Sequence, residues 1–302
     1  MAVVVLGSIN LDLIARIARV PKAGETGLAR SMTSSPGGKG ANQALAACRM
    51  GADTSLVGMV GDDAFAMQAL KFLRQDGVDL SRIGVSRERP TGLAMIVVEE
   101  SGQNAITVVP GANMELGSQG LSELQSLLSP HDTLLLQLEI PLDVVEQAIN
   151  LAHEAKCRVL LDPAPAIERL PKSCYRVDIL MPNQFEAEAL LGSPISDVRS
   201  AKAAARQLRG RGAAVAIIKL GEMGVVWATA RGLFYLPGEN VAAVDAVGAG
   251  DAFAGALAAR LDQGDGLSDA IRLANHAAAL STTKSGAQPS FPLWEAVQSL
   301  VR

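Results

Sequence analysis

Two glycine-rich segments carry the residue types that phosphate chemistry needs. Gly37–Gln43 reads GGKGANQ, and Asp245–Asp251 reads DAVGAGD much later in the chain. The second segment runs directly into Ala252–Leu257, an apolar stretch of helical character. Glycines let backbone N–H groups approach an anion closely, and a helix start adds a partial positive charge. Both segments are therefore predicted to be turns that open helices, and the later one to hold an anion.

Asp251 lies in the first turn of the later predicted helix. A carboxylate there would repel a phosphate, so it cannot be the ligand of the anion. It can instead take a proton beside a phosphate that other groups hold. Transfer of a phosphoryl group to an alcohol requires that arrangement, so the segment predicts a phosphotransferase with Asp251 as the base.

Composition excludes several other classes of protein. The chain has 302 residues, 49% hydrophobic and 3% aromatic, with a net charge of −4, so a nucleic-acid surface is not expected. No apolar run approaches the roughly 18 residues of a membrane span, and Met1–Leu6 reads as a buried strand, not a signal peptide. Three scattered cysteines indicate a reducing, cytoplasmic setting and no zinc site, and the three histidines are interpreted as incidental.

Short apolar runs alternate with helical patterns along most of the chain. The predicted strands are Val3–Leu6, Ser55–Met59, Thr133–Leu138, Arg158–Leu161, Ile179–Met181, Val215–Leu220 and Val225–Ala228. The predicted helices include Ala41–Met50, Ala64–Gln75, Leu142–Ala155, Phe185–Leu191 and Ser200–Arg209. This alternation predicts one α/β domain over 1–302, with a doubly wound, mostly parallel central sheet and helices on both faces. Ligands of such folds bind beyond the carboxyl ends of the strands.

Two segments, 13–36 and 91–109, break this alternation and predict a small β-sheet lid. The second reads as a hairpin, with strands Gly92–Val98 and Ala105–Val109 around a turn at Glu99–Gln103. Both faces of its first strand are apolar, which a small sheet with one face in water would not tolerate. We expect one face to cover the ligand and the other to meet a partner subunit in a homodimer. The alternative is a strand wholly inside one core.

The common nucleotide-binding motifs are absent from the sequence. It contains no GxxxxGK[ST] motif, and the first predicted strand leads into Gly7-Ser-Ile-Asn10 without a GxGxxG motif. A P-loop and a dinucleotide-binding site are therefore not expected. The phosphate site must be built from other segments.

Several polar residues near the predicted strand ends could bind a sugar. Asn10 and Asp12 offer the donors and acceptors that adjacent hydroxyls need, or they form a strand-end turn. Lys39 and Asn42 could bind a polyol, or Lys39 is a solvated lysine at a helix start. Glu139 ends an apolar strand, where a charge costs free energy unless it is paired or serves a ligand. A surface turn before Pro141 is the alternative for Glu139.

Other segments could border a nucleotide. Asn183 and Glu186 fit a capping box at a helix start, and they could also lie near phosphates and hydrated Mg²⁺. Lys219–Gly224 is a glycine-bounded hairpin turn, which in a nucleotide enzyme could border ATP. Gly61–Asp63 is interpreted as a helix N-cap.

Taken together, these segments resemble the PfkB family of carbohydrate kinases. The matching pieces are Gly7–Asp12, Gly37–Ala44, Gly61–Asp63, Gly111–Asn113, Gln137–Glu139, Asp162–Ala166, Pro182–Glu188, Leu220–Gly221, Gly248–Asp251 and Lys284–Ser290. They span nearly the whole chain in order. The GAGD turn marks the family in general, whereas GGKGANQA and GAQPS are more particular to its ribokinases.

The resemblance implies a role for each site residue. Asp251 resembles the base, and Gly248, Ala249 and Gly250 the turn whose N–H groups hold the transferred phosphoryl. Sugar contacts are implied for Asn10, Asp12, Gly38, Lys39, Gly40, Asn42 and Glu139. Positions around ATP are implied for Asn183, Glu186, Lys219, Gly221, Gly224, Gly250 and Asn275. A K⁺ site behind the anion-binding turn is implied for Asp245, Val247, Ser281, Lys284, Gly286 and Ser290.

Three positions depart from the family pattern. Ala246 stands where a threonine is usual, which removes a hydroxyl beside the implied cation site. Asp162 replaces a common asparagine, and Lys219 replaces a frequent threonine. Neither Asp162 nor Lys219 touches the implied base.

The resemblance implies ATP-dependent phosphorylation of a small sugar, with Mg²⁺ bridging the phosphates. The sugar-side motifs favour D-ribose, phosphorylated at its 5-hydroxyl. A kinase for another sugar or a nucleoside is one alternative, and a non-catalytic sugar- or nucleotide-binding regulator is another.

Overall fold

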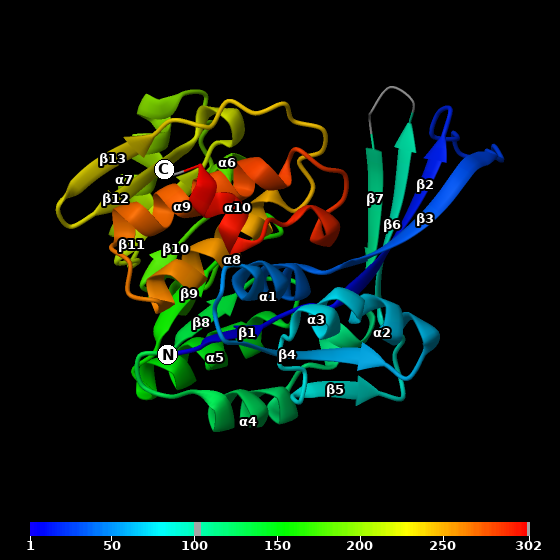
Figure 1. Cartoon of the computed structure of the whole chain (residues 1–302), viewed down its shortest axis with the longest axis horizontal. Helices are drawn as coiled ribbons and strands as arrows, with labels where there is room; N and C mark the ends of the chain where they lie inside the picture. Colours follow the sequence, from blue (N-terminus) through cyan, green and yellow to red (C-terminus); the bar gives the residue numbers. More distant parts are fainter. Residues whose placement is uncertain (100–103, 301–302) are drawn as a thin grey trace.

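The computed structural model of the chain describes residues 1–99 and 104–300. In these residues a nine-stranded sheet is surrounded by helices, and a four-stranded sheet stands apart from it (Figure 1). The large sheet has the order β13-β12-β11-β10-β9-β8-β1-β4-β5. Its strands are β1 (Val3–Leu6), β4 (Thr54–Gly61), β5 (Ile83–Ser86), β8 (Thr133–Leu136), β9 (Arg158–Leu161), β10 (Ile179–Leu180), β11 (Val215–Lys219), β12 (Val225–Thr229) and β13 (Gly232–Leu236).

The large sheet is parallel from β11 to β5, and β12 and β13 add an antiparallel hairpin. Side chains of the buried strand β1 alternate between two cores. Val3 and Val5 belong to one apolar cluster, and Val4 and Leu6 belong to the other. Because successive side chains of a strand point to opposite faces, both faces of the sheet are covered. The predicted doubly wound sheet is confirmed.

Helices supply the second wall of each core. They are α1 (Lys39–Arg49), α2 (Ala64–Ala69), α3 (Lys71–Asp76), α4 (Ser118–Leu127), α5 (Leu142–Glu154), α6 (Gln184–Leu191), α7 (Val198–Gly210), α8 (Ala249–Asp262), α9 (Leu267–Ser281) and α10 (Trp294–Ser299). Helices α1, α8 and α9 contribute to the Val3 cluster, and α5 and α7 to the Val4 cluster. No helix in the described ranges is long and apolar enough to cross a bilayer.

Some predicted elements differ from the structure. The predicted helix Ala64–Gln75 is two short helices, because Leu70 between them takes φ −90° and ψ 3° while its side chain is buried. Strands β5 and β13 were not predicted. Both lie at the edges of the sheet and keep exposed positions, so neither has the uninterrupted apolar run of a central strand.

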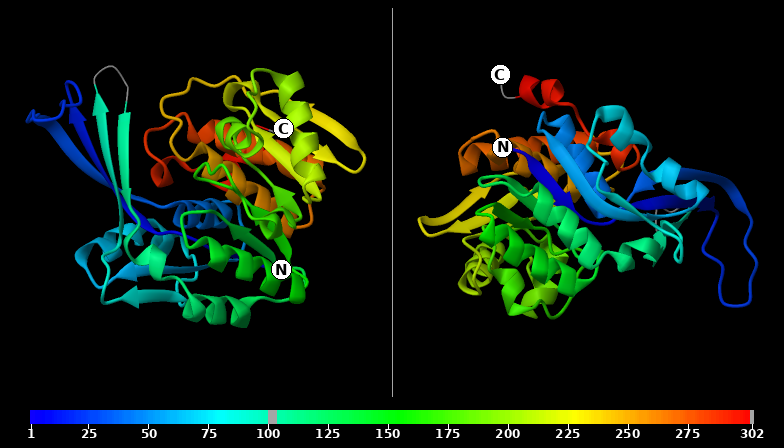
Figure 2. Two further views of the ribbon diagram at one scale, coloured as in Figure 1. Left: turned by 180° about the vertical axis from the view of Figure 1, so that it is seen from behind. Right: turned by 90° about the horizontal axis from the view of Figure 1, so that it is seen from below.

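The lid is the four-stranded sheet, with the order β3-β2-β6-β7. Its strands are β2 (Asn10–Ile17), β3 (Ala29–Gly37), β6 (Gly92–Glu99) and β7 (Asn104–Val109), and they project from the main body (Figures 1 and 2). Strands β2 and β6 are parallel, and the other two pairs are antiparallel. The predicted sheet is confirmed, whereas residues 100–103 of the predicted turn lie outside the described residues.

The lid begins earlier than predicted. Asn10 and Asp12 do not form a strand-end turn, because they lie within β2. Asp12 is in register with Ala94 of β6, so both side chains share one face of the lid. Leu13 and Leu93 lie on the opposite face and pack against the main core. That face is therefore partly covered by the chain itself.

Candidate active site

The two glycine turns meet because α1 and α8 pack unusually closely. A Cβ atom added to Gly255 of α8 would lie 2.5 Å from the carbonyl oxygen of Gln43 in α1. Only glycine permits this approach, which brings the first turns of the two helices together. Each first turn follows a glycine in the left-handed region, Gly38 with φ +88° and Gly248 with φ +79°.

Asp251, in the first turn of α8, is held by two amides from the N-terminal part of α1. Asn42 Nδ2 donates to its Oδ2 at 2.9 Å, and Gln43 Nε2 donates to its Oδ1 at 3.0 Å. Asp251 is 6% exposed, and burial raises the pKa of its carboxyl, with Lys39 and the two amides opposing the rise. The carboxylate is thus fixed in orientation and has a higher proton affinity than an exposed aspartate, as suits a general base.

Glu139 is tied to the start of α1 and is not a free surface residue. Its Oε2 accepts hydrogen bonds from Ser8 Oγ at 2.6 Å and from the backbone N–H of Lys39 at 3.1 Å. The Lys39 side chain is surrounded by carboxylates. Burial works against its charged form, but Asp251 and Glu139 raise its pKa well above the ordinary value. Lys39 is partly buried and interacts with these carboxylates, which favours a place in the site over a fully solvated lysine.

Asn10 and Asp12, at the start of strand β2 of the lid, lie beside the glycine turn that precedes α1. Asn10 is buried, and its Oδ1 accepts from Asn113 Nδ2 at 2.8 Å. Asp12 lies against Gly37, where an added Cβ would approach its carboxylate oxygens to within 2.5 Å. Burial, with the charges of Glu139 and Asp251, raises the pKa of Asp12 to about 7. Asn113, to which no role had been assigned, orients the amide of Asn10.

A cavity of about 530 Å³ opens on the other side of α8. Six of the residues predicted to surround a nucleotide line it, namely Asn183, Lys219, Gly221, Gly224, Gly250 and Asn275. Ala249 also lines it, so the cavity reaches the first turn of α8. Its walls include Val225, Ala246, Phe253 and Ala278. An apolar cavity with a few polar groups and a helix start fits a nucleotide.

Asn183 and Glu186 form a complete capping box at the start of α6. The N–H of Glu186 donates to Asn183 Oδ1 at 2.9 Å, and the N–H of Asn183 donates to Glu186 Oε2 at 2.7 Å. The capping interpretation is confirmed. Glu186 is buried and does not line the cavity, whereas Asn183 does.

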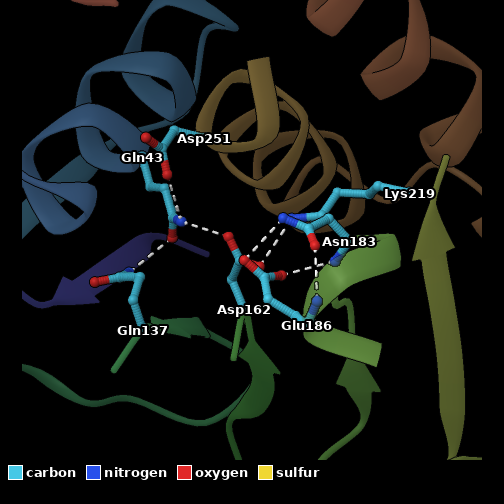
Figure 3. Close-up of polar contacts among 7 residues, drawn as sticks. All are labelled: Gln43, Gln137, Asp162, Asn183, Glu186, Lys219 and Asp251. Atoms are coloured by element: carbon cyan, nitrogen blue, oxygen red, sulfur yellow. Dashed lines mark hydrogen bonds and ion pairs between the residues drawn. The ribbon is translucent and has the colours of Figure 1, made fainter. Parts of the chain in front are cut away.

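A buried network joins the two sides of the site through residues to which no role had been assigned (Figure 3). Gln43 Nε2 donates to both Asp251 and Asp162, in each case at 3.0 Å. Gln43 Oε1 accepts from Gln137 Nε2 at 2.7 Å, and Asp162 Oδ1 pairs with Lys219 Nζ at 2.8 Å. The sequence offered one signal for these residues. Each lies in a segment that matches the family pattern, namely Gln43, Gln137 and Asp162.

The segments of the predicted cation site lie together behind the α8 turn. Asp245 Oδ2 accepts from the N–H of Gly286 at 2.8 Å, and its Oδ1 accepts from the N–H of Val247 at 3.0 Å. The Ser281 and Ser290 hydroxyls are buried and donate to backbone carbonyls within their own turns. Lys284 and Ser290 line one neighbouring cavity.

Comparison with known proteins identifies the family. The sequence model of the pfkB family carbohydrate kinases matches residues 2–294. The chain belongs to the PfkB family of carbohydrate kinases. This PfkB chain is 38% identical to a ribokinase of Schizosaccharomyces pombe over 96% of its length and 94% of the relative. It is 35% identical to a deoxyribokinase of Salmonella typhi over 97% and 96% of the two chains.

A solved structure shares the fold of this PfkB chain throughout. The structure of Arabidopsis thaliana ribokinase complexed with ribose and ATP superposes with a TM-score of 0.92 and 31% identity. The match covers 100% of this chain and 98% of the plant chain.

Proposed function

We propose that this chain is an ATP-dependent ribokinase, which transfers the γ-phosphate of ATP to the 5-hydroxyl of D-ribose. The full-length similarity to ribokinases supports the assignment. The observation that carries it is the position of Asp251. Its buried carboxylate lies where the acidic cluster of Asp12 and Glu139 meets the turn that closes the nucleotide cavity.

Asp251 would take the proton of the sugar hydroxyl while the first turn of α8 holds the transferred phosphoryl. The amides of Asn42 and Gln43 orient the carboxylate for this step. The N–H of Ala249 donates to the Ala246 carbonyl at 3.2 Å, a bond that a bound phosphoryl group would replace. Asp12, Glu139, Lys39, Asn10 and the glycines of the α1 turn are the proposed sugar contacts.

Two metal ions fit the proposed chemistry. Among the described residues there is no group of three or more His, Cys, Asp and Glu side chains that could hold a metal. Mg²⁺ usually binds through substrate phosphates and waters, with few protein ligands, and neutralises phosphate charge. Glu186 is the carboxylate proposed to lie near it. K⁺ would be held by Asp245 and Ser290 with carbonyls of Val247, Ser281, Lys284 and Gly286, because the bonded carboxylate and hydroxyl oxygens keep free lone pairs.

We further propose that the lid closes over the sugar and joins two chains in a homodimer. The lid exposes large apolar side chains, including Met95 at 45%, Ile106 at 55% and Val108 at 47%. Ala94 and Val108 are in register, so Val108 shares the face of Asp12. Sedimentation at micromolar concentration is expected to give a dimer, and a strictly monomeric chain would remove this proposal.

A cytoplasmic location is proposed because the reaction consumes ATP. The free thiols of Cys48, Cys157 and Cys174 are in keeping with a reducing compartment.

A kinase for 2-deoxy-D-ribose is the second candidate, because a deoxyribokinase is nearly as similar as the ribokinases. An ADP-release assay over a panel of sugars tests the choice. We expect D-ribose to give the highest kcat/KM. A higher value for 2-deoxy-D-ribose, another sugar or a nucleoside would replace the assignment, and the absence of turnover with every acceptor would favour a binding protein.

A further inference from the structure

Asp162 and Lys219 form an ion pair in which the carboxylate is buried and the lysine borders the nucleotide cavity. The Asp162 side chain is 2% exposed and the Lys219 side chain 12%, with 2.8 Å between Oδ1 and Nζ. Asp162 follows β9, and Lys219 ends β11. Breaking a buried pair by removing one partner leaves an uncompensated charge, so each residue requires the other.

The ammonium of Lys219 faces the turn that is proposed to hold the phosphoryl group. Lys219 lines the nucleotide cavity with Ala249 and Gly250. A Cβ added to Gly250 would lie 3.5 Å from Lys219 Nζ. A positive charge at this point can neutralise charge that develops on a transferred phosphate.

The carboxylate of Asp162 links this ammonium to Asp251 through one amide. One oxygen of Asp162 pairs with Lys219, and the other accepts from Gln43 Nε2. The same Nε2 donates to Asp251 (Figure 3). Gln137 fixes the direction of the Gln43 amide, because its own Nε2 donates to Gln43 Oε1. The Asp162 carboxylate, which pairs with a residue of the nucleotide cavity, and the Asp251 carboxylate therefore share a single donor.

We propose that Lys219 contacts the transferred phosphate, and that Asp162 is the positioning residue that aligns Lys219 with Asp251 through Gln43. This inference rests on the proposed kinase function. The groups that act on Asp251 from the packed elements are Lys39 of α1, Asp12 of β2 and Asp162 after β9. The negative charge of Asp162 raises the pKa of Asp251, so the pair also affects the base.

A double-mutant cycle with Asp162→Asn, Lys219→Met and the double variant tests the inference. Each single variant is expected to lower kcat about 10- to 100-fold, with KM for ribose nearly unchanged. The double variant should lose no more than the worse single variant, because the two residues act as one unit. In Asp162→Asn, the acid limb of kcat/KM against pH should move to lower pH, because a negative charge near Asp251 has been removed.

Asp265→Asn is the matched control. It breaks the partly buried Arg260–Asp265 pair at the end of α8, which spans 2.6 Å, and it should leave kcat and the acid limb unchanged. Losses that multiply in the double variant, or an unmoved acid limb in Asp162→Asn, would overturn the inference. Thermal unfolding identifies any single variant that fails to fold. In the double variant neither member of the pair is left charged, so its kcat and KM for ribose can still be compared with those of the wild type.

Calorimetry separates this inference from the proposed function. Lys219→Met should weaken ATP binding about tenfold and leave adenosine binding unchanged, because only ATP presents phosphates. If the wild-type chain binds ATP but phosphorylates no sugar, the proposed function fails while this binding test still stands. Equal losses for ATP and adenosine would contradict the contact between Lys219 and phosphate.

Discussion

The proposed site has a sugar end and a nucleotide end, which differ in the number of charged side chains that they contain. At the sugar end, Asp12, Glu139 and Lys39 lie close together, and their charges perturb one another. At the nucleotide end, the cavity has glycine turns and apolar walls, and Lys219 supplies its cation. Charged side chains that are fixed in a low-dielectric site, as at the sugar end, discriminate strongly between ligands. Apolar walls and backbone contacts, as in the nucleotide cavity, discriminate less. Substitutions of the charged residues at the sugar end should therefore have larger and more pH-dependent effects than substitutions of the neutral residues that line the nucleotide cavity.

The largest effect is expected where the two ends meet. Asp251→Asn should lower kcat by about 10²–10⁴ because the base is lost, while the isosteric amide keeps the packing. Steady-state kinetics measures the loss, and calorimetry with D-ribose provides the control, since sugar binding should survive. Turnover near the wild-type level would remove Asp251 from its assigned role.

At the sugar end, Asp12→Asn should raise KM for ribose about 10- to 100-fold, because a charged acceptor for sugar hydroxyls is lost. Steady-state kinetics measures this change.

Asp12→Asn should also change how the stability of the protein depends on pH. The pKa of Asp12 is raised to about 7, so the folded state binds a proton more tightly than the unfolded state. Wild-type stability should therefore fall relative to Asp12→Asn as the pH rises from about 4 to about 7. Melting temperatures of the ligand-free proteins that differ by the same amount at both pH values would contradict this.

The predicted cation site lies behind the meeting point of the two ends. Replacing K⁺ with choline should lower kcat about 3- to 10-fold, because the proposed ion would stiffen the anion-binding turn electrostatically without touching either substrate. Rates are compared at constant ionic strength, with Na⁺ as a further control. Identical rates in K⁺ and choline would count against the site.

The smallest effect is expected deep in the nucleotide cavity. Asn275 lines the cavity, and its Nδ2 donates to the Pro237 carbonyl at 3.2 Å. Asn275→Ala should raise KM for ATP about 3- to 10-fold and leave kcat and KM for ribose unchanged, because it removes one neutral polar group. An effect as large as that of Asp12→Asn would end the distinction between the two ends.

The central sheet was predictable because buried parallel strands leave continuous apolar runs in the sequence. The Val3–Leu6 strand has no polar face, and it lies between two cores. The edge strands β5 and β13 were missed because their exposed positions break that pattern. Leu70 shows the same limit for helices, since nothing in the local sequence marks the change of backbone there.

The site was predictable as a set of segments, and less so as a set of contacts. Gly38, Gly248 and Asp251 could be placed at helix starts because glycine turns have a clear local signal. The contacts of Gln43 with Asp162 and Asp251 could not be predicted, because they join residues more than a hundred positions apart and depend on how closely α1 approaches α8.

The reaction itself can be tested by identifying its products with ³¹P and ¹³C NMR after the wild-type chain is incubated with ATP, Mg²⁺, K⁺ and D-ribose. We expect stoichiometric ADP and ribose phosphorylated on C5. ADP with inorganic phosphate and unchanged ribose, or phosphate on another carbon, would contradict it.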